Sequence, residues 1–463
     1  MAVGEQGLQL HMAEPATRSS GALEGMTGNN FSAFPDAEAR SQTREALHHE
    51  YRERLVDKPA FRQLVTYVPN KMEPIHSWFA YKEAFSRRLV EAMLNEFKAT
   101  AETLVLDPFC GCGTTPLACQ QVGVPAIGVD ILEVAIFATR VKLRRRQEYD
   151  TQLLQESIER LIRTPFNDPE GALPDIRIIP RAFTPQTIQE IVFFKELISN
   201  EADQATRDFL LLGLISILED VSFTSKDGQF LRLVDREIPP VRQVLARKLE
   251  SMCVDLVHNG SQPSLFDNSM DGSIKAAVLC GDARELPLKP EMVDIVITSP
   301  PYLNRYDYSR IYTLELALHF VDSFEELKEV RHSLLRSHIE VRPADTNDVK
   351  MPALDEILAN LEDRKLNNNR IPVMIKGYFE DMFIAIKEMY RVMRTGGRVA
   401  LVVGNARFAG EVVPVDMMLS KLAEEAGFRT DAIWVTRYKG NSSQQMGRYG
   451  RRPVRESIIL WQK

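Results

Sequence analysis

A glycine-containing loop at residues 107–115, Asp-Pro-Phe-Cys-Gly-Cys-Gly-Thr-Thr, has the residue types of a ligand site. Glycines at 111 and 113 allow the backbone to approach a ligand closely, and the Asp107 carboxylate can accept hydrogen bonds from an ammonium group. The loop lacks the third glycine of a dinucleotide-binding motif and the Gly-Lys-Ser/Thr of a phosphate-binding loop. We therefore expect a ligand with amino-acid and ribose parts, and a dehydrogenase is disfavoured.

A proline-rigidified turn, Ser299-Pro300-Pro301-Tyr302, is the second candidate site. Its prolines remove amide donors and leave carbonyl acceptors, which suits a substrate that offers an amino group. The Ser299 hydroxyl and the Pro300 carbonyl could hold two amino hydrogens and turn the nitrogen lone pair toward an electrophile, while Tyr302 stacks on the substrate ring. In-line transfer of a sulfonium methyl group to such an amine needs no covalent enzyme intermediate. The chain has no Pro-Cys dipeptide, where the cysteine used for methylation of a ring carbon would lie.

Acidic residues end two more predicted strands. Asp130 ends the apolar stretch 125–130, and Asp282 ends the stretch 276–282. A single aspartate at a strand end is often only a turn or cap residue. Three at successive strand ends beside a glycine loop instead indicate one site, in which Asp130 binds ribose hydroxyls and Asp282 accepts from an adenine amino group.

The elements that must bring these segments together alternate between strands and helices. Phe85, Leu89, Met93 and Phe97 have helical spacing, which predicts a helix directly before the first strand. Strand, glycine loop, helix and strand then follow in the order of a doubly wound α/β sheet. The predicted strands are 103–107, 125–130, 276–282, 293–302, 398–405, 431–437 and 456–463. The later predicted helices begin near 116, 377 and 415, and Gly427 is expected to cap the last one.

Two interruptions of this alternation divide the chain into segments. We expect a flexible leader at 1–45, the N-terminal helices and first half of the α/β domain at 46–140, a mostly helical insertion at 141–272, and the second half of the domain at 273–463. Within the second half, a polar and irregular insertion is predicted at about 303–372.

On its two motifs the chain resembles the DNA methyltransferases that modify exocyclic amino groups. Residues 107–115 are similar to their cofactor motif and 298–302 to their catalytic motif. The resemblance implies a Rossmann-like, seven-stranded class I methyltransferase sheet, S-adenosylmethionine as methyl donor, and a target base flipped out of double-stranded DNA. It implies cofactor contacts from Phe85, Asp107, Pro108, Phe109, Gly111, Gly113, Thr114, Asp130, Ile131, Asp282 and Ala283, and catalytic roles for Ser299, Pro300, Pro301 and Tyr302.

The first residue of the catalytic turn indicates the target base. Serine at 299 is typical of cytosine N4 enzymes, whereas adenine N6 enzymes more often carry Asp or Asn there. We therefore expect N4 of cytosine, with N6 of adenine as the alternative. An RNA methyltransferase and a non-catalytic cofactor-binding scaffold are further alternatives. We see no convincing nuclease constellation, so a restriction or defence-system partner would be a separate protein.

Positive charge must be local if this chain binds DNA, because the net charge is −7. One basic run spans 140–146, and it is explained equally well as a solvated helix end. A second run, 437–455, interleaves Arg and Lys with Tyr, Asn, Ser and Gln and lies between the last two predicted strands. These types suit phosphate and base-edge contacts. We expect DNA contacts from Arg437, Lys439, Asn441, Ser442, Gln444, Arg448 and Arg451.

Composition bounds the remaining possibilities. With 44% hydrophobic and 26% charged residues the chain has the make-up of a soluble globular protein, and no apolar run approaches the roughly 18 residues of a membrane-spanning helix. The N-terminus lacks the basic-then-apolar order of a signal peptide, so we expect a cytoplasmic protein. Five cysteines, two of them in the glycine loop, fit neither a disulfide framework nor a zinc site.

Overall fold

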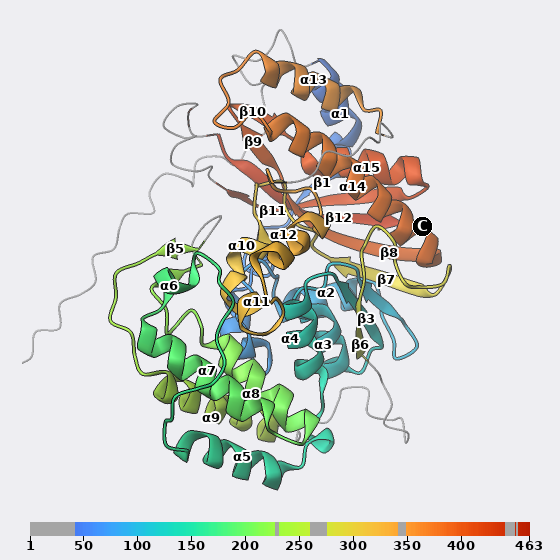
Figure 1. The fold of residues 1–463 in the computed structure, drawn as a ribbon. Helices are drawn as coiled ribbons and strands as arrows, with labels where there is room; N and C mark the ends of the chain where they lie inside the picture. Colours follow the sequence, from blue (N-terminus) through green and yellow to red (C-terminus); the bar gives the residue numbers. More distant parts are fainter. Residues whose placement is uncertain (1–41, 227–230, 260–275, 341–348, 440–449, 451) are drawn as a thin grey trace, which may run out of the picture. The chain divides into compact units, whose positions relative to one another are not determined.

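The central sheet of the computed structural model has eight strands in the order β1-β11-β12-β8-β7-β2-β3-β6 (Figure 1). The structure describes residues 42–226, 231–259, 276–340, 349–439, 450 and 452–463. Strand β12 runs antiparallel to both of its neighbours, and the other neighbouring strands are parallel. The strands are β1 (Leu55–Asp57), β2 (Val105–Asp107), β3 (Ala126–Asp130), β6 (Ala276–Cys280), β7 (Val293–Thr298), β8 (Met393–Gly404), β11 (Arg429–Lys439) and β12 (Val454–Gln462).

The seven expected strands are all present, and β1 adds an eighth at the edge beside β11. Its three residues are half-buried or exposed, so no pattern in the sequence marks them as a strand. Val56 pairs with Trp434 of β11, and this pairing with a distant segment gives the strand its conformation. Residues 1–41 of the expected leader lie outside the described residues, and helix α1 (Gln42–Tyr51) crosses its predicted end at 45.

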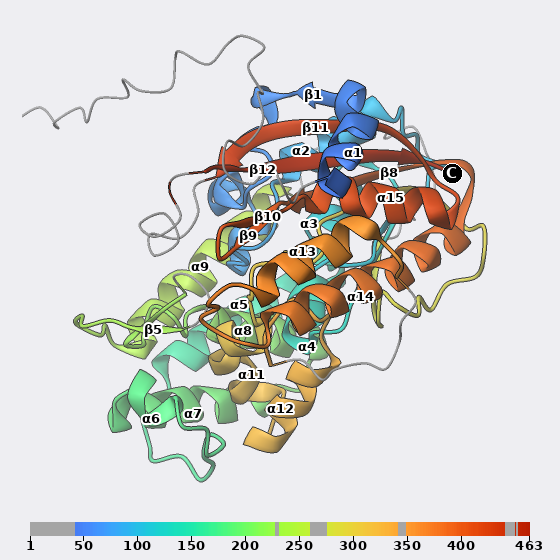
Figure 2. The ribbon, with the colours of Figure 1, turned by 90° about the horizontal axis from the view of Figure 1, so that it is seen from above.

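Helices cover both faces of the sheet (Figure 2). Side chains alternate between the two faces of a strand, so Ala400 and Val402 of β8 pack with α2 and α3, whereas Val399 and Leu401 pack with α14 and α15. The covering helices are α2 (Arg87–Glu96), α3 (Thr114–Val122), α4 (Glu133–Leu143), α14 (Ile371–Val392) and α15 (Val415–Ala426). The predicted helices are confirmed, and Gly427 caps α15 with φ of +111°.

The insertion is mostly helical, as expected. Helices α8 and α9 pack closely, since a Cβ at Gly213 would press into Leu249. A small antiparallel hairpin of β4 and β5 was not predicted, because its strands are only two residues long. The elements are η6 (Arg146–Glu148), α5 (Thr151–Arg163), α6 (Ile179–Ala182), α7 (Pro185–Ser199), α8 (Gln204–Ser216), β4 (Thr224–Ser225), β5 (Arg232–Leu233) and α9 (Val241–Asn259).

The prediction that 303–372 is irregular is wrong for its described residues, which form α10 (Tyr308–Ile311), α11 (Thr313–His319), α12 (Phe324–Ser333) and α13 (Pro352–Glu362). These helices are short and alternate with polar loops, so apolar periodicity is weak over a long window. Local signals were present nevertheless. The Asp307 and Ser323 side chains accept from backbone amides of the first turns of α10 and α12.

The remaining elements are short. Strands β9 (Ala406–Phe408) and β10 (Glu411–Val413) form a separate antiparallel hairpin. Single 3-10 turns are η2 (Arg52–Arg54), η3 (Pro59–Phe61), η4 (Val68–Met72) and η5 (His76–Trp78). Across the described ranges, no helix combines the length and the apolar character that crossing a bilayer requires.

Candidate active site

The carboxyl ends of β2 and β7 meet at the candidate site. The two strands are parallel neighbours, with Leu106 paired to Val296. At their ends the Thr298 hydroxyl donates to Asp107 Oδ1 over 2.6 Å. The residue that precedes the catalytic turn therefore contacts the acid that begins the glycine loop.

Three donors hold the buried Asp107 carboxylate. These are the hydroxyl of Thr298, the hydroxyl of Thr115 at 2.6 Å and the backbone amide of Phe109 at 3.2 Å. Burial raises the pKa of Asp107 to about 6, because it removes water from the charged form, and the three donors oppose that shift. A carboxylate can accept about four hydrogen bonds, so Asp107 retains capacity for one more donor.

Both glycines of the loop adopt left-handed backbone conformations. The φ angle is +49° at Gly111 and +79° at Gly113. A Cβ at Gly111 would lie 2.9 Å from the Tyr81 ring, and a Cβ at Gly113 would collide with Thr139. Glycine is therefore required at both positions for backbone and packing reasons.

Helix α4 fastens the loop through two side chains. The Thr139 hydroxyl donates to the Gly111 carbonyl over 3.0 Å, and the Lys142 ammonium donates to the Cys112 carbonyl over 2.9 Å. Lys142 belongs to the basic run 140–146 but is buried. It supports the cofactor loop from inside the fold and is not placed to contact DNA.

The other two strand-end acids are already engaged. Asp130 accepts from the amides of Gly111 at 2.8 Å and Leu132 at 2.9 Å, and burial raises its pKa. Asp282 forms an ion pair with Arg284 at 2.6 Å, and Arg284 also bonds Asp381. Sequence reasoning did not foresee this arginine beside the predicted adenine contact.

A cleft of about 890 Å³, including space open to solvent, lies at these strand ends. Among the predicted cofactor residues only Gly113 does not line it, and Ser299 and Pro301 of the catalytic turn line it too. Its volume suits a nucleoside-sized ligand. The cleft contains Asp107, which can accept from an ammonium group, and Asp130, which can accept from ribose hydroxyls, and the catalytic turn also lines it. The residues present therefore fit S-adenosylmethionine.

The structure adds cleft residues that sequence reasoning missed. Tyr81 and Glu83 lie just before the predicted contact Phe85, and Tyr308 follows the catalytic turn, so proximity to known motifs was the available signal. No sequence signal marked the wall that α12 and the chain after it supply. That wall consists of Ser333, Leu334, Leu335 and Ser337.

Within the catalytic turn the side chains have different surroundings. The Ser299 hydroxyl donates to the Val402 carbonyl over 3.1 Å. Pro300 and Tyr302 are not among the cleft-lining residues. The Tyr302 ring packs against Gly404, its hydroxyl donates to Glu456 over 3.0 Å, and the Lys439 ammonium lies 5.2 Å from its centroid.

The predicted DNA-binding run is only partly described. Arg437 and Lys439 lie at the end of β11, and both form ion pairs with the buried Glu456. Arg455 pairs with the buried Asp416 at 3.0 Å. The remaining predicted contacts lie outside the described residues; they are Asn441, Ser442, Gln444, Arg448 and Arg451. In the described part of the chain, no group of three or more His, Cys, Asp or Glu residues could hold a metal ion.

Comparison with known proteins identifies the family of the chain. A family model described as DNA methylase matches residues 41–139. The Type II methyltransferase M.BsoBI of Geobacillus stearothermophilus is 33% identical over 454 residues, which is 87% of this chain and 88% of that protein. The Type II methyltransferase M.AvaI of a Nostoc strain is also 33% identical, over 91% of this chain and 94% of its own. The chain therefore belongs to the DNA methyltransferases that modify exocyclic amino groups, and its cofactor is S-adenosylmethionine.

Proposed function

We propose that this protein transfers the methyl group of S-adenosylmethionine to N4 of cytosine at a specific site in double-stranded DNA. The observation that carries the proposal is the setting of Ser299. Its hydroxyl hydrogen is used on the Val402 carbonyl, so its oxygen presents lone pairs as a neutral acceptor. Ser299 lines the same cleft as Asp107 and Asp130. An amino group held there would lie beside the cofactor.

Two acceptors would orient the amine of a base extruded from the duplex. One hydrogen would go to Ser299 Oγ and the other to the Pro300 carbonyl, which leaves the nitrogen lone pair free to attack. The Tyr302 ring would support the base. Since Lys439 lies over this ring, the base would have to displace the ammonium or stack beside it.

The strand-end acids would hold the donor. Asp107 has one acceptor position left for the α-ammonium, Asp130 would bind ribose hydroxyls, and Asp282 with the adjacent Ala283 would bind the adenine edge. Bound S-adenosylmethionine supplies an electrophilic sulfonium methyl group. The cleft residues then contribute by fixing the amine in line with it, which converts the transfer into a unimolecular step.

The DNA would lie against the end of β11 and the residues that follow it. Arg437, Lys439 and the predicted contacts within 441–451 would supply phosphate and base-edge contacts. The relatives carry the name Type II methyltransferase, so we propose that this enzyme marks sites for a separate restriction or defence-system protein. We further propose that it acts in the cytoplasm.

The test is to identify the methylated nucleoside. Plasmid DNA from cells expressing the wild-type chain, and from cells expressing Ser299→Ala, is digested to nucleosides and analysed by mass spectrometry. We expect N4-methylcytosine only with the wild type, and sequencing of the modified positions should give one recognition sequence. N6-methyladenine in its place would overturn the choice of base, and methylation confined to RNA would overturn the choice of DNA.

A further inference from the structure

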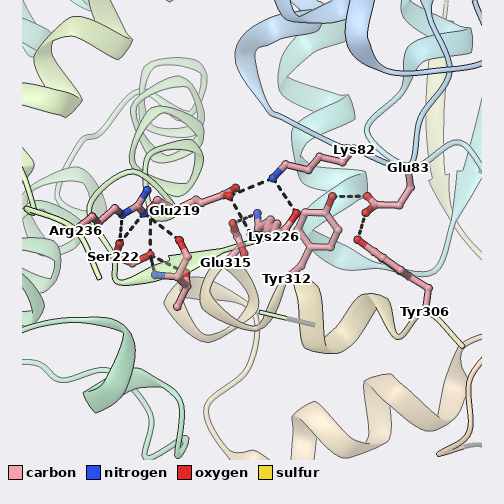
Figure 3. Close-up of polar contacts among 10 residues, drawn as sticks. Lys82, Glu83, Glu219, Ser222, Lys226, Arg236, Tyr306, Tyr312 and Glu315 are labelled. Carbon is pink, nitrogen blue, oxygen red and sulfur yellow. Dashed lines mark hydrogen bonds and ion pairs between the residues drawn. The ribbon is translucent and has the colours of Figure 1, made fainter. Parts of the chain in front are cut away.

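Glu83 lines the cofactor cleft. Figure 3 shows its side chain beside Tyr306 and Tyr312, which belong to the segment after the catalytic turn. Each of its two carboxylate oxygens accepts one hydrogen bond from a tyrosine hydroxyl. Tyr306 donates to Oε1, and Tyr312 donates to Oε2 over 2.7 Å. Burial raises the pKa of both tyrosines, so the two hydroxyls remain protonated donors.

The two tyrosines belong to the segment directly after the catalytic turn. Tyr306 precedes α10, and Tyr312 lies between α10 and α11 and is fully buried. The Tyr312 ring also stacks on Tyr81, with centroids 4.9 Å apart and planes within 6°. Residues 81–83 thus bind this segment both by ring stacking and by two hydrogen bonds.

The helical insertion holds the same region from the other side. In Figure 3 the Lys82 ammonium points toward the insertion, where it bonds Glu219 at 3.1 Å and the Lys226 carbonyl at 2.9 Å. The Lys226 ammonium in turn forms a buried ion pair with Glu315 of α11. Its nitrogen also lies 4.4 Å from the centroid of the Tyr312 ring. The insertion, the cleft wall and α11 are therefore linked by one continuous polar network.

We propose that Glu83 is a positioning residue for methyl transfer, which holds the helices after the catalytic turn against the cofactor cleft through Tyr306 and Tyr312. The catalytic turn is continuous in sequence with these helices, so their placement sets where the turn presents the base amine. The insertion supports this arrangement through Lys226 and Glu315. This inference rests on the proposed transfer to a base amine.

The proposal is tested with variants that break the hydrogen bonds of Glu83 but keep the size of the side chains. Glu83→Gln replaces one acceptor oxygen with an NH2 donor, and Tyr312→Phe removes a donor but keeps the ring. We expect each to slow single-turnover methyl transfer at least about tenfold, because small displacements of reacting groups are costly. The dissociation constant for S-adenosylmethionine, measured by calorimetry, should change less than about twofold, and the double variant should be no slower than the slower single variant.

A tyrosine–glutamate hydrogen bond elsewhere in the chain provides the control for these variants. Tyr51 donates to Glu424 over 2.8 Å, which is the same kind of bond, and neither residue lines the cleft, so Tyr51→Phe should leave the transfer rate unchanged. Unchanged rates in the Glu83 and Tyr312 variants, additive losses in the double variant, or weaker cofactor binding in Glu83→Gln alone would each overturn the positioning role. A wild-type chain that methylates no DNA would instead refute the proposed function.

Discussion

The single residue Asp107 connects the cofactor loop to the end of β7, the strand that leads into the catalytic turn. Its carboxylate bonds Thr298 and also lines the cleft. Because burial raises its pKa to about 6, the group is mostly ionised at pH 7 and becomes protonated as the pH falls below that value. A protonated carboxyl group attracts an ammonium much more weakly. We therefore expect the affinity for S-adenosylmethionine to fall between pH 7 and pH 5.

Calorimetric titrations at a series of pH values check this expectation. In Asp107→Asn the affinity should be low throughout and the dependence on pH near 6 should disappear. A flat profile for the wild-type chain would show that Asp107 is not the acceptor for the ammonium.

Ser299 acts on the substrate amine, so its loss should affect the chemical step and not cofactor binding. We expect Ser299→Ala to lower the single-turnover rate roughly 100-fold, the size of effect seen when one preorganised polar group is removed. Ser199→Ala is the matched control, because that hydroxyl also donates to a backbone carbonyl, of Lys195 at 2.8 Å, and does not line the cleft. Equal rates for Ser299→Ala and the wild type would remove Ser299 from the mechanism.

The site residues that could be predicted are those in contiguous motifs. Asp107, Gly111 and Ser299 stand in short segments whose residue types already imply chemistry. The missed residues become neighbours only through the fold. Glu83 accepts a hydrogen bond from Tyr312, although 229 positions separate them in the sequence. Glu456 of β12 accepts one from Tyr302, which follows β7, because only β8 lies between these two strands in the sheet. No local pattern encodes such pairs.

At the scale of elements, strands and helices with strong periodicity were predictable and the short ones were not. The second half of strand β8, residues 399–403, is an apolar run, and α14 shows apolar residues at helical spacing throughout. Strand β1 and helix α10 have three and four residues, too few for either period to show. Their conformations depend on contacts with β11 and with residues 81–83.

The link between the insertion and α11 is testable as a contribution to stability. Lys226 and Glu315 have side chains only 4% and 2% exposed. Removing one partner leaves the other charge buried without compensation, so we expect Lys226→Met to lower the free energy of unfolding by about 3–5 kcal/mol. Burial already raises the pKa of Glu315, and Lys226 opposes that shift.

Urea unfolding measures this loss against two comparisons. Lys226→Met combined with Glu315→Met should recover most of the stability, because neither charge is then left alone. Lys421→Met breaks the exposed pair with Glu50, whose side chains are 47% and 38% exposed, and should cost less than about 1 kcal/mol. A similar small loss in Lys226→Met would mean that the buried pair does not fasten the insertion.

For the whole molecule, DNA binding depends on where the positive charges lie more than on the net charge. The chain carries a net charge of −7, and several basic residues of the run expected to face DNA are paired with buried acids. Arg437 and Lys439 share Glu456, and Arg455 pairs with Asp416. Sequence reasoning overlooked these acids because Glu456 lies just beyond the basic run and Asp416 lies on α15. Arg437 and Lys439 could contact phosphate only while sharing their charge with Glu456.

Cofactor binding should stabilise the whole chain, because the cleft exists only in the folded state. Its walls come from residues 81–132 and 281–337, which the sheet brings together. A ligand that binds only the folded state stabilises it by about 2.7 kcal/mol at a hundredfold excess over its dissociation constant. We expect that gain with S-adenosylhomocysteine, measured by urea unfolding at 25 °C, and no gain with NAD, whose pyrophosphate this loop is not built to hold. Stabilisation by NAD but not by S-adenosylhomocysteine would reverse the assignment of the cleft.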